Sequence, residues 1–110
     1  MAILKVARLG NPILRKVAEP VPVQCISSPA VQRLLHDMVE TMWEYDGVGL
    51  AAPQIHESLQ IIVVDAMGFS RKPKAKRSAP AVLINPVISV ISEKEIDDWE
   101  GCLSIPDIRG

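Results

Sequence analysis

The stretch that decides the fold is SPAVQRLLHDMVETMWEYDG, residues 28–47. Apolar side chains recur in it at intervals of three and four positions, the period of a helix with one buried face. Ser28 is a good N-cap, Pro29 suits the first helical position, and Gly47 is placed to end the helix in a left-handed conformation. The stretch therefore predicts an amphipathic helix whose buried stripe comprises Val31, Leu34, Leu35, Met38, Val39, Met42 and Trp43.

Strands are predicted after this helix and an extended segment before it. LQIIVVDA (59–66) and AVLINPVISVIS (81–92) are rich in β-branched residues, although Asn-Pro interrupts the second. LGNPILRKVAEPVPV (9–23) carries three prolines and no sustained period, so we expect an arm or loop lying across the domain, anchored by its Leu and Ile side chains. The pattern predicts an α+β fold in which a mixed or antiparallel sheet packs on a long N-terminal helix.

A basic run lies between the two predicted strands. Five of the seven residues 71–77 are Lys or Arg, and Gly, Pro and Ser flank them. Such a run can contact phosphate, but in this setting we expect a solvated loop and assign it no function.

Composition excludes several classes of protein. The 110 residues are 48% apolar with a net charge of −1, which suits one domain and provides no field for nucleic acid or anionic lipid. No apolar run is long enough for a membrane span, and the N-terminus does not have the pattern of a secretory signal. We therefore expect a cytoplasmic protein in which Cys25 and Cys102 are reduced thiols.

Two short stretches carry the chemistry. GVGLAAPQ (47–54) has two glycines and two alanines, which leave the backbone open to close approach by another group. On its own, the stretch is equally well explained as a tight connection between helix and strand. EGCLSIP (100–106) contains Cys102, but a single cysteine on its own is more often a small buried apolar residue than a ligand or nucleophile. Neither stretch by itself specifies a function.

Together, the two stretches resemble the bacterial peptide deformylases, whose motifs have the forms G-x-G-Φ-A-A-x-Q and E-G-C-Φ-S. The arm GNPILRKVAEPV, the INPVI segment and the order of the elements are also similar, so that residues 1–110 resemble the N-terminal part of a single deformylase domain. The resemblance implies an enzyme, a metal-dependent hydrolase that removes the formyl group from the initiator methionine of nascent polypeptides. Its implied partners are N-formylmethionyl peptides and nascent chains at the ribosome, with no direct binding to nucleic acid or membrane.

The resemblance also implies roles for individual residues. Cys102 matches a thiolate ligand of one divalent metal ion, Fe²⁺ in the cell, with Zn²⁺, Ni²⁺ or Co²⁺ also accepted. Gln54 and the backbone N–H of Leu103 match the two donors that stabilise the oxyanion.

Further matches concern the peptide substrate and the support of the site. Val48 and Gly49 match the methionine pocket and the contact with the peptide backbone. Glu100 matches a residue that supports the metal site through its neighbours, and Arg109 corresponds to an arginine that contacts the peptide.

The third motif of the family, H-E-x-x-H, does not occur in residues 1–110, and neither His36 nor His56 has the spacing to replace it. We expect two histidine ligands and the glutamate base beyond residue 110, in a catalytic helix without which this fold is incomplete and the 110-residue chain inactive. Two other hypotheses stay open: a degenerate deformylase-like module that binds peptides without catalysis, and an interaction domain in which Cys102 is a buried structural residue.

Overall fold

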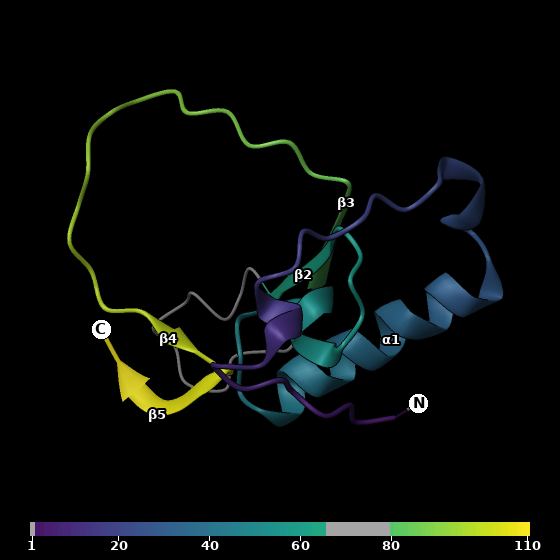
Figure 1. The fold of residues 1–110 in the computed structure, drawn as a ribbon, viewed down its shortest axis with the longest axis horizontal. Coiled ribbons are helices and arrows are strands. Elements are labelled where there is room, and N and C mark those ends of the chain that lie inside the picture. The colour runs from purple at the N-terminus through teal and green to yellow at the C-terminus, as the bar shows by residue number, and fades with distance from the viewer. Residues whose placement is uncertain (1, 66–79) are drawn as a thin grey trace.

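The computed structural model describes residues 2–65 and 80–110, so the basic run at 71–77 lies outside the described residues. One long helix, α1 (Pro29–Glu44), packs against a three-stranded antiparallel sheet in the order β1 (Gly49–Ala51), β2 (Ile61–Asp65), β3 (Pro80–Ile84). A separate hairpin joins β4 (Gly101–Cys102) and β5 (Ile105–Arg109) (Figure 1). The α+β prediction is confirmed, and both sheets are antiparallel.

The helix begins as predicted and ends differently. The Ser28 hydroxyl accepts a hydrogen bond from the N–H of Val31, and Pro29 is the first helical residue. At the other end Asp46, with φ of 55°, takes the left-handed position that was predicted for Gly47. The N–H of Gly47 donates to the carbonyl of Met42 at 2.8 Å, and the N–H of Asp46 donates to the carbonyl of Trp43 at 3.1 Å. These two bonds form a Schellman motif at the end of the helix.

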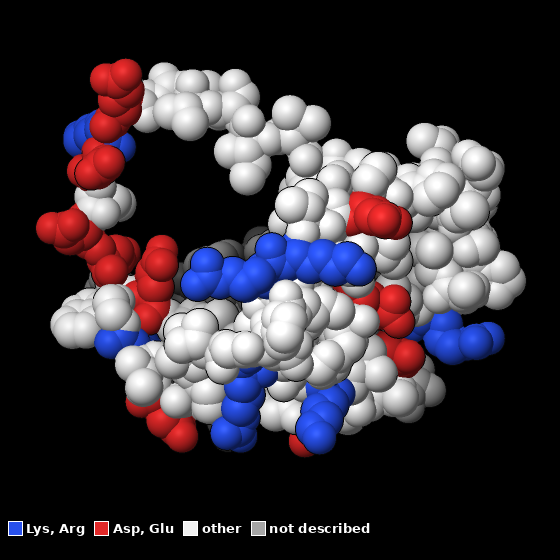
Figure 2. All heavy atoms as spheres, in the orientation of Figure 1, with Lys and Arg blue, Asp and Glu red and all other residues white. Residues whose placement is uncertain are grey.

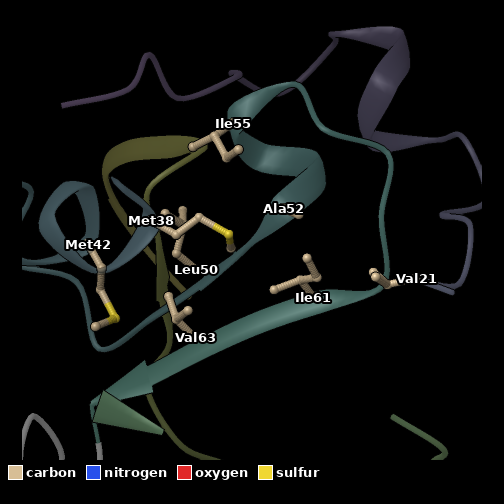
Figure 3. Close-up of a cluster of buried hydrophobic side chains, with 8 residues drawn as sticks. All are labelled: Val21, Met38, Met42, Leu50, Ala52, Ile55, Ile61 and Val63. Atoms are coloured by element: carbon tan, nitrogen blue, oxygen red, sulfur yellow. The ribbon is translucent and has the colours of Figure 1, made fainter. Parts of the chain in front are cut away.

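The core lies between the helix and the sheet. In β2, Ile61 and Val63 point inward at alternate positions and meet Leu50 of β1. The predicted apolar stripe of α1 covers this surface, as expected from its helical period. The buried cluster, drawn in Figure 3, consists of Val21, Met38, Met42, Leu50, Ala52, Ile55, Ile61 and Val63.

The N-terminal arm, residues 2–22, runs across the body with one 3-10 turn at Pro12–Leu14, and the part predicted as an arm or loop, residues 9–23, contains no strand or α-helix. Its buried anchors are Ala7 and Val21, whereas Leu9 is 71% exposed. The prediction that Leu and Ile side chains anchor the arm was therefore wrong for Leu9.

The second predicted strand is shorter than expected, because it stops at Ile84. Asn85 turns the chain with φ of 53°, and its side chain bonds both backbone groups of Val21, at 2.7 Å to the N–H and 2.8 Å to the carbonyl. From there the chain makes a wide arc to β4 (Figure 1). The first part of the arc is apolar and the part before β4 is largely acidic (Figure 2). Its apolar side chains Val87, Ile88, Val90 and Ile91 are 81–97% exposed.

Replacing Asn85 tests this junction between the arm and β3. Asn85→Ala removes two hydrogen bonds and puts alanine, which adopts the left-handed region less readily than asparagine, at a φ of 53°, so we expect the free energy of unfolding to fall by about 2–4 kcal/mol. Asn85→Gly removes the same bonds but tolerates the backbone angle, so its loss should be smaller. Urea unfolding of the three chains measures both values. Unchanged stability in both variants would mean that the Val21 contacts contribute nothing.

Candidate active site

Gln54 closes the first motif and has a fixed side-chain orientation. It lies in η3 (Ala52–Ile55), the 3-10 turn that follows β1, and its Oε1 accepts a hydrogen bond from the N–H of Ala51 at 3.0 Å. A backbone N–H requires an oxygen opposite it, so this contact identifies which end of the amide is which. The NH₂ group therefore points the other way, toward the second motif.

The second motif meets Gln54 at two atoms. Nε2 of Gln54 lies 3.7 Å from Sγ of Cys102 and 3.1 Å from Oγ of Ser104. Gln54 and Cys102, which are separated by 48 positions in the sequence, are thus brought together. Cys102 is a free and exposed thiol, whereas Cys25 is free and half-buried. Because Cys102 is exposed, the hypothesis of a buried structural cysteine is wrong for this residue.

The N-terminal arm holds the two motifs side by side. The N–H of Ala7 donates to the carbonyl of Gln54 at 2.6 Å, and the N–H of Leu9 donates to the carbonyl of Ser104 at 2.8 Å. Sequence reasoning missed both contacts, because they use backbone groups that any residue carries. It also assigned no role to Ser104, although this residue lies inside the quoted motif.

Small residues of the first motif make room for the second. A β-carbon on Gly47 would lie 2.9 Å from Cδ1 of Leu103, so the glycine permits the packing of that half-buried leucine. Gly49 is less constrained, since its β-carbon would meet only the carbonyl of Val63 at 3.7 Å. Val48 is 37% exposed next to this segment, and its carbonyl accepts a hydrogen bond from the N–H of Asp65.

The hairpin β4–β5 carries the remaining predicted residues. Gly101 pairs with Arg109, and the backbones of Glu100 and Gly110 exchange hydrogen bonds of 2.7 and 3.0 Å. A hollow of about 390 Å³ runs along the hairpin, lined by Asp98, Glu100, Gly101, Cys102, Ile105, Ile108 and Gly110.

Two predicted site residues, Glu100 and Arg109, make no side-chain hydrogen bond with Gln54 or Cys102 across residues 2–65 and 80–110. The side chains of both are exposed. The structure therefore brings Gln54, Cys102 and Leu103 together, while Glu100 and Arg109 lie at the edge of this site.

The donor set of the described residues suits part of a metal site. An accessible thiol beside an amide N–H fits a single soft ligand whose sulfur accepts a hydrogen bond. No group of three or more His, Cys, Asp or Glu side chains in the described part of the chain is arranged to hold an ion. The described residues therefore fit a metal site with respect to one ligand, the thiol of Cys102.

Comparison with known proteins identifies relatives of the whole chain. The family described as "Polypeptide deformylase" matches residues 3–110. Peptide deformylase 2 of Pseudomonas putida is 41% identical over 105 residues, 96% of this chain and 59% of that protein. The peptide deformylase of Leptospira biflexa is 40% identical over 111 residues, 100% of this chain and 62% of that protein. The chain thus spans about three fifths of these curated relatives.

Solved structures agree with the sequence matches. A Met-Ala-Ser-bound class I type b peptide deformylase from Acinetobacter baumannii superposes with a TM-score of 0.86 at 38% identity, covering 99% of this chain and 69% of that one. The peptide deformylase from Thermotoga maritima gives 0.82 at 35% identity, covering 99% of this chain and 65% of that one.

Proposed function

The chain belongs to the polypeptide deformylase family, and from that premise we propose that it supplies one wall of the active site of a metal-dependent hydrolase. The proposed reaction removes the formyl group from the N-terminal methionine of newly made polypeptides. The substrate class is therefore an N-formylmethionyl peptide, met in the cytoplasm on nascent chains, without a direct contact to nucleic acid or membrane. No helix within residues 2–65 and 80–110 is long and apolar enough to cross a bilayer.

One observation carries this proposal: the Gln54 amide donates toward the exposed Cys102 thiol at 3.7 Å. A formamide carbonyl reacts slowly with water unless the nucleophile is activated and the developing oxyanion is stabilised. A ligand and a hydrogen-bond donor placed side by side serve these two needs.

Cys102 would hold one divalent ion, Fe²⁺ in the cell, with Zn²⁺, Ni²⁺ or Co²⁺ as substitutes. Such an ion supplies Lewis-acid activation of water at neutral pH. The other two ligands and the general base would come from an H-E-x-x-H segment, which residues 1–110 do not contain. The family membership supports this assignment of the metal.

The chain's own residues would bind and orient the substrate. Gln54 donates from Nε2 to the oxyanion, and the N–H of Leu103 donates beside it. This N–H has no hydrogen-bond acceptor among the described residues, so it is available to the substrate. Val48 and Gly49 form the edge that receives the methionine and the peptide backbone. The peptide in the A. baumannii relative supports a peptide substrate for this chain.

Glu100 and Arg109 have secondary roles in the proposal. Glu100 precedes the hairpin and its backbone is bonded to Gly110, so it steadies the strand that presents Cys102. Arg109, exposed on β5 opposite Gly101, would contact the peptide beyond its first residues.

Residues 1–110 alone should not hydrolyse a formyl-Met peptide, because they lack the base and two ligands. The comparison is with a continued chain, defined as residues 1–110 followed by the part of the P. putida deformylase beyond the matched region, which we expect to carry H-E-x-x-H. The continued chain should bind one metal ion and release formate from the peptide, as measured by a formate assay.

Chelator-sensitive turnover by highly purified residues 1–110 would contradict this prediction. Peptide binding without metal or turnover in the continued chain would overturn the proposed hydrolase and favour the non-catalytic peptide-binding module.

A further inference from the structure

We propose that Ser104 is a positioning residue for deformylation, which fixes the Gln54 amide so that one of its N–H groups faces the reacting carbonyl. This inference rests on the proposed function, because it acts through the role given to Gln54.

Ser104 is built into the site more firmly than its neighbours in the motif. It is 5% exposed, whereas Cys102, two residues earlier, is exposed. Its carbonyl is held by the N–H of Leu9 at 2.8 Å, so the arm fixes its backbone. Its Oγ accepts a hydrogen bond from Nε2 of Gln54 at 3.1 Å. A buried hydroxyl with a fixed backbone is a rigid acceptor.

Because the amide of Gln54 is planar, the hydroxyl of Ser104 determines where the second N–H group of that amide points. Gln54 has one carbonyl oxygen and two N–H groups in a single plane. The N–H of Ala51 fixes the oxygen at 3.0 Å, and Ser104 takes one N–H. With two of the three groups fixed, the remaining N–H can only point toward the side of Cys102, whose sulfur lies 3.7 Å from Nε2.

Without the Ser104 hydroxyl, the amide keeps its contact with the N–H of Ala51 and the long 3.7 Å approach of Nε2 to Sγ of Cys102. The terminal torsion of glutamine is broad, and a 3.7 Å contact with sulfur holds the amide plane less firmly than the 3.1 Å hydrogen bond to Ser104, so the plane can rotate more freely. When the N–H of Gln54 is no longer held in the orientation that faces the oxyanion, it stabilises the oxyanion less. The peptide still binds through other residues. The expected signature is a lower kcat at nearly unchanged KM.

The chain offers a matched control for this serine. Oγ of Ser58 is buried and accepts or donates no hydrogen bond among the described residues. Its removal therefore deletes a buried hydroxyl without disturbing an interaction. In the metal-loaded continued chain, we expect Ser104→Ala to lower kcat roughly threefold to tenfold, and Ser58→Ala to leave kcat unchanged.

A double-mutant cycle with Gln54→Leu tests whether Ser104 acts through Gln54. We measure kcat and KM for Ser104→Ala, Gln54→Leu and the double variant, with metal content and melting temperature for each. The double variant should be no slower than Gln54→Leu alone, because no amide remains to be positioned.

The outcomes separate this inference from the proposed function. If Gln54→Leu is slow and Ser104→Ala has the full kcat, or lowers it by the same factor in both backgrounds, Ser104 does not position Gln54. If Gln54→Leu itself has the full kcat, the role proposed for Gln54 fails and this inference fails with it.

Discussion

Cys102→Ala should remove both the metal ion and the hydrolysis of formyl-Met peptides from the continued chain. A methyl group cannot coordinate an ion, and two imidazoles left alone hold a catalytic metal poorly. The exposed position of Cys102 means that the substitution leaves no buried cavity, so the fold should persist. The measurement is metal stoichiometry beside kcat, with circular dichroism to confirm folding. We expect activity below detection.

Cys25→Ala is the matched control. Cys25 ends the 3-10 turn Val23–Cys25 and packs, half-buried, against the core, so its loss removes a small apolar contact and no ligand. Metal content and kcat should stay at the values of the unchanged chain. Equal losses in both variants would point to a structural role for thiols and contradict the assignment of Cys102. Cys102→Ser is less informative, because an oxygen ligand retains some metal.

Gln54→Leu should lower kcat by roughly 10²–10³, equivalent to about 3–4 kcal/mol of transition-state stabilisation. Leucine nearly preserves the volume but leaves the oxyanion with one donor fewer. Peptide binding, assigned mainly to Val48 and Gly49, should change little, so KM should stay close to its original value. The metal should remain, since Cys102 is untouched. Steady-state kinetics with a formyl-Met peptide measure both constants.

Gln60→Leu controls for the loss of a glutamine side chain elsewhere. Nε2 of Gln60 donates to the carbonyl of Ala18 at 3.1 Å, a contact with the N-terminal arm that does not involve either motif. Its removal should cost some stability and leave kcat unchanged. An unchanged kcat in Gln54→Leu, or a rise in KM alone, would show that Gln54 does not contact the reacting carbonyl.

The helix was predictable from the sequence because its causes are local. The apolar period, the Ser28 cap and Pro29 all act within a few residues, and the structure places each as expected. The end of β3 was not predictable in the same way. The β-branched residues of 87–92 favour a strand, but Asn85 bonds the backbone of Val21, 64 positions away, and turns the chain. A contact between residues so far apart in the sequence produces no periodic pattern from which the end of the strand could be predicted.

The site shows the same division between local and distant causes. The motifs identified Gln54 and Cys102 through resemblance to a family, and the structure brings them within 3.7 Å. The contribution of the N-terminal arm was not predictable, because Ala7 bonds Gln54 through its backbone N–H. Ser104 was visible in its motif, but its role depends on the orientation of an amide that only the fold defines.

The most direct test of the central claim, that Cys102 is the thiolate ligand of a deformylase, is the absorption spectrum of the Co²⁺-loaded continued chain. Sulfur ligation gives a thiolate-to-cobalt charge-transfer band that nitrogen and oxygen ligands do not give. We predict that the band rises with one equivalent of Co²⁺, is retained in Cys25→Ala and disappears in Cys102→Ala. A band that persists in Cys102→Ala, or is lost in Cys25→Ala, would contradict the account.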